Sequence, residues 1–286
     1  LHQLHRRQRQ MCIRDRLPVM GREGSVQDIA LSEQNNINTL LDEQFERIVF
    51  WVEHDTYDQF MLLRGLTLLE ETEGKVIEII EFNQFPGTER FIGFGQLPAE
   101  AVRSCWQHRK PVTSKLRSQT KRCWQTLTSP APQSLIELLS QHELDCLPNI
   151  KAAMKRHLQE LPHSESGLSF TQQLALEALA EHSTPITVKD WFQEYQEKEP
   201  LPTLGDVMFY ALLLPLTRSD KPLFSIDSLQ KNWWEQQVCI TEHAQACLEG
   251  SQPITQNYWV GGMQVRESNL WVWDHNQLSS LSHKEW

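Results

Sequence analysis

Five consecutive apolar residues, Ile48 to Val52, constrain the fold of this chain more than any other feature. The run is short, rich in β-branched and aromatic side chains and free of polar alternation, which is typical of a strand buried on both faces. An apolar segment over residues 57–70 follows, and a second β-rich run at residues 76–80 comes after Gly74. Strand, helix and strand in this order predict a β-α-β unit, whose strands pair in parallel through a right-handed crossover.

The remaining patterns place the chain in the α/β fold class, with a second part that is mainly α. We interpret residues 17–95 as an α/β domain truncated at its N-terminus. Helical periodicity predicts a helical region over residues 96–162. A winged-helix-like domain is expected over residues 163–276, followed by a tail of residues 277–286.

The winged-helix prediction rests on the order of three helices, a short strand and a C-terminal hairpin. Ser169 and Gln172 have the spacing of a capping box at the start of the first helix. The short strand is predicted at residues 237–240, and the hairpin from strands at 257–265 and 269–274.

Residues 1–16 differ from the rest of the chain because they hold five arginines, one acid and no helix or strand periodicity. They resemble translated library-adapter sequence, so we expect them to be artefactual or disordered and exclude them from the fold. A genuine basic arm is the alternative.

Charge and composition limit the expected partners and the expected location of the protein. The net charge of −10 repels polyanions on average, so DNA is not an expected partner. The absence of an apolar run of 18 residues argues against a membrane-spanning helix. The first 20 residues also lack the apolar core of a signal peptide. The six cysteines include no C-x-x-C pair and indicate buried thiols of a reducing compartment. We therefore expect a cytoplasmic protein with no membrane partner.

The best candidate for a catalytic site follows the first predicted strand. Glu53, His54, Asp55 and Asp58 lie at the carboxyl end of that strand, where open α/β sheets bind ligands, and Gln59 is a candidate binding residue. The carboxylates favour a cation such as Mg²⁺, whereas a helix N-terminus there favours an anion. His54 would act as a general base, with Asp55 or Asp58 as its orienter or as a metal ligand. No metal ligands are assigned from the sequence, and the cofactor is unknown, with Mg²⁺ as a candidate.

A structural explanation of the same residues stays open. Thr56 and Gln59 have capping-box spacing, and Asp55 and Asp58 would complement the dipole of the helix that begins there. His54 would then be a loop residue. No P-loop is present, and Gly93 and Gly95 lack the third glycine of a dinucleotide fingerprint.

Two further segments are candidates for binding surfaces. Residues 101–122 contain seven bases and no acid, so this segment is a candidate for phosphate binding, with Trp106 or Trp124 as a stacking surface. A solvated helix face, or contacts between the bases and acids elsewhere in the chain, explains the seven bases better. Trp271 and Trp273 alternate with Val272 along a strand, so they form either an aromatic binding patch or a packed core.

DNA readout by the predicted winged helix is disfavoured by its third helix. Residues 203–216 contain no Lys or Arg, and their second half is apolar. We therefore expect this helix to be buried in the protein rather than to enter the major groove of DNA.

Several signatures together resemble an uncharacterised bacterial family, a domain of unknown function, over residues 27–275. The matching stretches are Phe50-Trp51-Val52-Glu53-His54-Asp55-Thr56-Tyr57-Asp58-Gln59-Phe60, Gly167-Leu168-Ser169-Phe170-Thr171, Leu204-Gly205-Asp206, Trp259-Val260-Gly261-Gly262 and Leu270-Trp271-Val272-Trp273-Asp274. The resemblance implies an earlier N-terminal strand and a Gly-Asp turn that this chain lacks, but it implies no activity.

Two hypotheses about function follow. The first is an interaction or regulatory module that binds a protein partner or a small molecule. The second is an α/β enzyme of hydrolytic or phosphoryl-handling type, with its site at Glu53, His54, Asp55 and Asp58.

Overall fold

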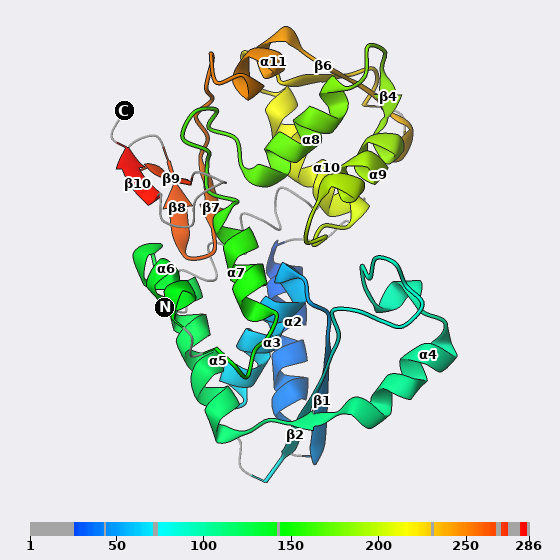
Figure 1. Cartoon of the computed structure of the whole chain (residues 1–286), viewed down its shortest axis with the longest axis vertical. Coiled ribbons are helices and arrows are strands. Elements are labelled where there is room, and N and C mark those ends of the chain that lie inside the picture. The colour runs from blue at the N-terminus through cyan, green and yellow to red at the C-terminus, as the bar shows by residue number, and fades with distance from the viewer. Residues whose placement is uncertain are drawn as a thin grey trace. The chain divides into compact units, whose positions relative to one another are not determined.

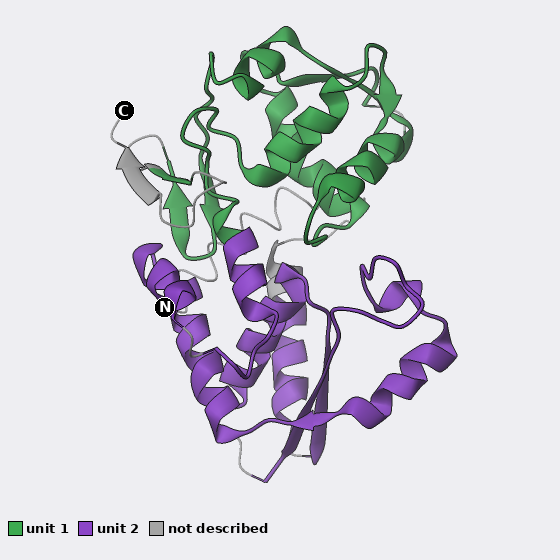
Figure 2. Ribbon diagram, viewed as in Figure 1, with its two compact units in different colours: residues 1–27, 157–286 green, residues 28–156 purple. Residues whose placement is uncertain are grey.

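Two compact units make up the described part of the chain (Figure 2). One contains residues 28–156, and the other contains the described residues before 28 and after 156. The computed structural model describes residues 26–42, 44–70, 74–141, 144–229, 232–266, 270–273 and 281–284. The predictions for residues 1–16 fall outside these ranges. None of the described helices combines the length and the apolar character needed to cross a bilayer.

The predicted β-α-β unit is confirmed. Strand β1 (Arg47–Val52), helix α3 (Thr56–Leu68) and strand β2 (Val76–Glu81) follow one another, and the two strands pair in parallel (Figure 1). A short third strand, β3 (Lys110–Pro111), pairs antiparallel with β2. The sheet therefore has the order β1-β2-β3 and is mixed rather than wholly parallel.

Helix α3 approaches β1 closely because Gly65 has no side chain. A Cβ atom at Gly65 would lie 2.5 Å from the ring of Phe50, which is far inside van der Waals contact. On either side of this glycine, Leu62, Leu63 and Leu66 are buried. The contact fixes the distance between helix and sheet, and with it the position of the segment that joins them.

The helices that follow the sheet belong to the same unit, so the predicted boundary between residues 95 and 96 is not a boundary between units. Helix α5 (Ser114–Leu127) buries an apolar face that includes Leu116, Cys123 and Leu127, and it packs against α3. The other helical segments of this region are η1 (Phe94–Gln96), α4 (Ala99–Ser104), η2 (Cys105–His108), α6 (Gln133–Ser140) and α7 (Ile150–Leu158).

One helix was not predicted. Helix α2 (Val26–Leu41) lies in a stretch that reads as polar, and an ion pair of 2.6 Å between Arg64 and Glu33 joins it to α3.

The second unit contains the predicted order of helices and a small antiparallel sheet. Ser169 caps helix α8 and forms the predicted capping box with Gln172. The sheet has the order β4-β6-β5. The elements are α8 (Phe170–Ala180), β4 (Ile186–Thr187), α9 (Val188–Lys198), α10 (Asp206–Leu213), η3 (Leu214–Thr217), β5 (Phe224–Ile226), η4 (Trp233–Glu235), β6 (Gln237–Ile240) and α11 (Glu242–Leu248).

The predicted C-terminal hairpin is wrong in its pairing. Strands β7 (Tyr258–Val260) and β8 (Met263–Val265) form a hairpin of their own, because Gly261 adopts φ +57° and turns the chain. Strand β9 (Leu270–Trp273) pairs instead with β10 (Leu281–Lys284), which lies in the predicted tail. The predicted strand ends at 269 and 274 fall outside the described residues.

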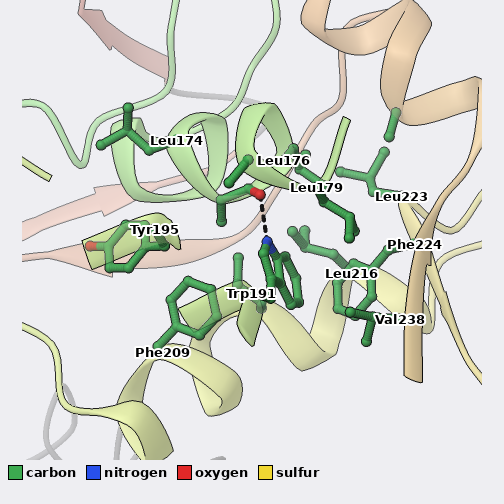
Figure 3. Packing of buried hydrophobic residues seen from close by; sticks show 14 of the residues in the cluster. Leu174, Leu176, Leu179, Trp191, Tyr195, Phe209, Leu216, Leu223, Phe224 and Val238 are labelled. Carbon is green, nitrogen blue, oxygen red and sulfur yellow. Dashed lines mark hydrogen bonds between the residues drawn. The ribbon is translucent and has the colours of Figure 1, made fainter. Parts of the chain in front are cut away.

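Aromatic rings fill the core of the second unit (Figure 3). Trp191 is fully buried, and its indole N–H donates a hydrogen bond of 2.6 Å to the carbonyl of Ala175. Its ring meets those of Phe209 and Phe224 edge to face, at centroid distances of 5.1 and 4.9 Å. Such pairs add to the free energy gained by burying the rings.

We expect Trp191→Ala to lower the free energy of unfolding by about 3–5 kcal/mol, because it leaves a large cavity and removes the hydrogen bond of the indole. Urea unfolding followed by circular dichroism measures this change. Trp234→Ala, at a tryptophan that is 45% exposed, is the matched control and should change the value by less than about 1 kcal/mol. Equal effects of the two substitutions would contradict the assignment of Trp191 to the core.

Candidate functional site

Three of the predicted site residues converge at the carboxyl end of β1. Carboxylate oxygens of Glu53, Asp55 and Asp58 all lie within 4.8 Å of one another. The convergence has a local cause, because only three residues separate the end of β1 from the start of α3. Two of the acids lie in this short connection, and the third is in the first turn of the helix.

Asp55, rather than Thr56, caps helix α3, so the predicted capping box of Thr56 and Gln59 is wrong. Asp55 has extended backbone angles, and its carboxylate accepts a hydrogen bond of 2.9 Å from the backbone N–H of Asp58. Thr56 is already the first helical residue. In return, the carboxylate of Asp58 accepts a bond of 2.8 Å from the N–H of Glu53, so it closes the turn.

Glu53 lies against a distant segment of the chain. Its carboxylate accepts a hydrogen bond of 2.6 Å from the backbone N–H of Phe94. A Cβ atom at Gly93 would lie 2.3 Å from the carboxylate, so any larger residue there would displace it. Gly93, which has no place in a dinucleotide fingerprint, therefore makes room for this acid.

Burial and mutual repulsion disfavour ionisation of the cluster. Burial, followed by the charges of Asp58 and Glu53, raises the pKa of Asp55 to about 6 although backbone N–H groups act in the opposite direction. Burial also raises the pKa of Glu53. Among the described residues, no Lys or Arg forms an ion pair with any of the three acids. The site thus concentrates negative charge that no described side chain neutralises.

His54 does not join the three carboxylates. Its ring lies near Phe91, at a centroid distance of 6.0 Å, and burial lowers its pKa. Its Nδ1 atom is buried without a hydrogen-bond partner among the described residues. The imidazole is therefore neutral at pH 7, as a general base must be before it takes a proton.

Gln59, predicted as a binding residue, is completely buried and connects the two parallel strands. Its side-chain NH₂ donates to the carbonyl of Glu53 at 2.7 Å and to the carboxylate of Glu81 at 3.0 Å. The same oxygen of Glu81 accepts a bond of 2.8 Å from Asn149, whose carbonyl oxygen accepts a bond of 3.1 Å from Asn83.

Sequence reasoning missed Glu81, Asn83 and Asn149. A signal for the first two existed, because Glu81 ends β2 and the carboxyl ends of parallel neighbours meet at one edge of a sheet. For Asn149, which is 68 residues away from Glu81, no sequence pattern gave a signal.

The tryptophans predicted as a binding patch lie mostly inside the second unit. Trp273 is fully buried and Trp271 is half-buried, so Trp273 is not available as a surface for binding. Burial of Val272 on the opposite side of the strand shows that both faces of β9 are covered.

Most bases of the segment 101–122 form ion pairs or hydrogen bonds with other groups of the chain. Trp106 is partly exposed, and the guanidinium of Arg109 lies 3.9 Å above its ring. Trp124 is half-buried. The ion pairs of the segment are Arg103–Glu100, Arg109–Glu78, Lys115–Asp145 and Lys121–Glu70, while Arg117 and Arg122 donate to Leu69 and Gln141.

Comparison with models of protein families and with curated proteins found no match for this chain. The resemblance to a bacterial domain of unknown function stays a prediction.

We expect the stability of the unit to depend on the ionisation of Asp55. Between its ordinary pKa of 3.8 and the folded value of about 6, the folded protein binds more protons than the unfolded chain. The free energy of unfolding should therefore fall as the pH rises through this interval and change little through this group above it. Asp55→Asn, which keeps the cap, should remove this slope and stabilise the protein at pH 7.5 by about 1–3 kcal/mol.

Urea unfolding of the wild type and the variant between pH 4 and 8 measures the slope. Asp206→Asn, at an exposed acid in the first turn of α10, is the matched control and should leave the slope unchanged. A wild-type slope that survives in Asp55→Asn would show that another group is responsible.

Proposed function

We propose that the unit of residues 28–156 binds a divalent cation, with Mg²⁺ as the first candidate, at Glu53, Asp55 and Asp58. On this basis we propose an α/β enzyme of hydrolytic or phosphoryl-handling type. The observation that carries the proposal is the convergence of three carboxylates within 4.8 Å with no described Lys or Arg paired to them. Two like charges about 4 Å apart repel by about 4 kcal/mol near a protein surface, and a cation would offset this cost.

The donor set suits a hard cation. Carboxylate oxygens are the ligands that Mg²⁺ prefers, and Mg²⁺ keeps several of its waters when it binds proteins. Each acid is held by a backbone N–H, so the three are ordered by the fold itself. The side-chain carbonyl oxygen of Gln59 is buried and has no hydrogen-bond partner among the described residues, and such an acceptor suits a donor such as a metal-bound water.

The residues of the site would have distinct roles in such an enzyme. A bound cation supplies Lewis acidity toward a water or a phosphoryl oxygen. His54, which is neutral and next to Glu53 in the chain, is the candidate general base. Asp55 fixes the start of α3 and orders Asp58.

Binding of Mg²⁺ or Mn²⁺ to the full chain, measured by isothermal titration calorimetry at pH 7.5, tests the proposal. We expect one site, and we expect Asp58→Asn to weaken its affinity at least about tenfold, because a ligand charge is lost. Asp206→Asn is the matched control and should bind like the wild type. Absence of binding by the wild type at millimolar metal would refute the proposed site.

An interaction or regulatory function is the second candidate, and we propose that the second unit, as a winged-helix-like module, would carry it. The order of its elements and the sheet order β4-β6-β5 support this interpretation. The segment between β5 and β6 exposes Leu229 by 70% and Trp234 by 45%. Large apolar side chains that are exposed on one segment of the chain are candidates for contact with a protein partner. Helix α10 has no basic residue and is largely buried, which supports a protein rather than DNA as the partner.

The double variant Leu229→Ser/Trp234→Ser should lose any specific partner that the wild type captures from an extract of the source cells, because the apolar contact area is removed. Its circular dichroism and unfolding curve should match those of the wild type, since both residues are exposed. Leu31→Ser, at an exposed leucine of the other unit, is the control. Equal capture by the wild type and the double variant would contradict this function.

We also propose a cytoplasmic location. Cys105, Cys123 and Cys247 are free and buried, and burial raises the pKa of Cys123 to about 12 and that of Cys247 to about 11. Unreactive free thiols of this kind are typical of a reducing compartment.

A further inference from the structure

We propose that Gln59, Glu81 and Asn149 form a positioning network that holds Glu53 in place for cation binding. The inference rests on the proposed cation site and adds residues that do not themselves contact the cation. Glu81 lies outside the group of acids whose oxygens are within 4.8 Å of one another. We infer that it acts on the site through the residues to which it is hydrogen-bonded.

The first link is the amide of Gln59. Both of its hydrogen-bond partners, the carbonyl of Glu53 and the carboxylate of Glu81, are acceptors, so the orientation of the amide is fixed with its NH₂ toward them. Gln59 is completely buried, and water cannot replace either bond without rearrangement. The residue after β1 and the last residue of β2 are thus held together by one side chain.

The second link holds Glu81. One oxygen of its carboxylate accepts from the amide groups of both Gln59 and Asn149. Hydrogen bonds to a charged acceptor are stronger than neutral ones, and Asn149 is itself buried. Glu81 is therefore a fixed anchor rather than a mobile surface acid.

The consequence for Glu53 concerns its backbone. Its backbone N–H donates to the carboxylate of Asp58, and its backbone carbonyl accepts from the amide of Gln59, so both backbone polar atoms have side-chain partners. Its carboxylate then reaches the N–H of Phe94. Removal of the anchor would free the carbonyl and let this carboxylate move away from Asp55 and Asp58.

Substitutions at Glu81 separate positioning from charge. In Glu81→Gln an amide oxygen can still accept from Gln59 and Asn149, whereas Glu81→Ala loses both bonds. We expect Glu81→Ala to weaken Mn²⁺ binding about tenfold or more, as is usual when a supporting hydrogen bond is lost, and Glu81→Gln to stay within about threefold of the wild type. Glu78→Gln, on the same strand but paired with Arg47 and Arg109, is the matched control and should leave the affinity unchanged.

A second measurement does not need the cation. In the metal-free protein, hydrogen exchange of the Phe94 amide reports on its bond to the Glu53 carboxylate. The exchange should become faster in Glu81→Ala and remain at the wild-type rate in Glu81→Gln, while unchanged exchange of the amides of α5, in the same unit, confirms that this unit is folded in both variants.

The outcomes distinguish the two proposals. Slow exchange of the Phe94 amide in Glu81→Ala would overturn the network whether or not metal binds. An equal loss of Mn²⁺ affinity in Glu81→Gln and Glu81→Ala would also overturn it, because Glu81 would then act through its charge. Exchange of the Phe94 amide can follow the expected pattern in the wild type and the two variants while the wild type binds no Mn²⁺. In that case the cation site is refuted and the positioning of Glu53 stands.

Discussion

The tight connection between β1 and α3 is the constraint on which the site depends. The apolar strand must lie against the helix, and Gly65 allows the two to approach until the helix backbone meets the ring of Phe50. The chain then has three residues in which to turn from strand to helix. Acids in so short a turn are forced together, and the backbone N–H groups of the turn hold them there.

The same acids stabilise the fold through hydrogen bonds and destabilise it through burial and mutual repulsion. Asp55 stabilises α3 as its cap, yet burial beside two other acids raises its pKa to about 6. A cap alone needs neither the burial nor the neighbours, since an exposed Asp, Asn or Ser caps a helix as well. Structural capping therefore explains Asp55 but not Glu53, which is held by Phe94 and accommodated by Gly93. This difference favours a ligand over a purely structural explanation.

The second unit is built on a different principle. Its centre is a group of aromatic rings around Trp191, with a hydrogen bond that satisfies the indole N–H. Most of its tryptophans contribute to packing, as Trp273 shows, whereas Trp234 remains at the surface. The converging acids therefore lie in the first unit, whereas the segment between β5 and β6 of the second unit exposes large apolar side chains.

The sequence by itself determined the local elements: the parallel pair of strands with the helix between them, the capping box of Ser169, and the acids at the end of β1. These follow from periodicity and from hydrogen bonds between residues a few positions apart. Only the tertiary structure decided that Asp55 rather than Thr56 caps α3, that α5 completes the core of the first unit, and that Gly261 divides a predicted strand into a hairpin. It also decided the partners of the site, because Phe94 is 41 residues from Glu53 and Glu81 is 22 residues from Gln59. Contacts over such separations depend on how the elements pack, and no local pattern encodes that packing.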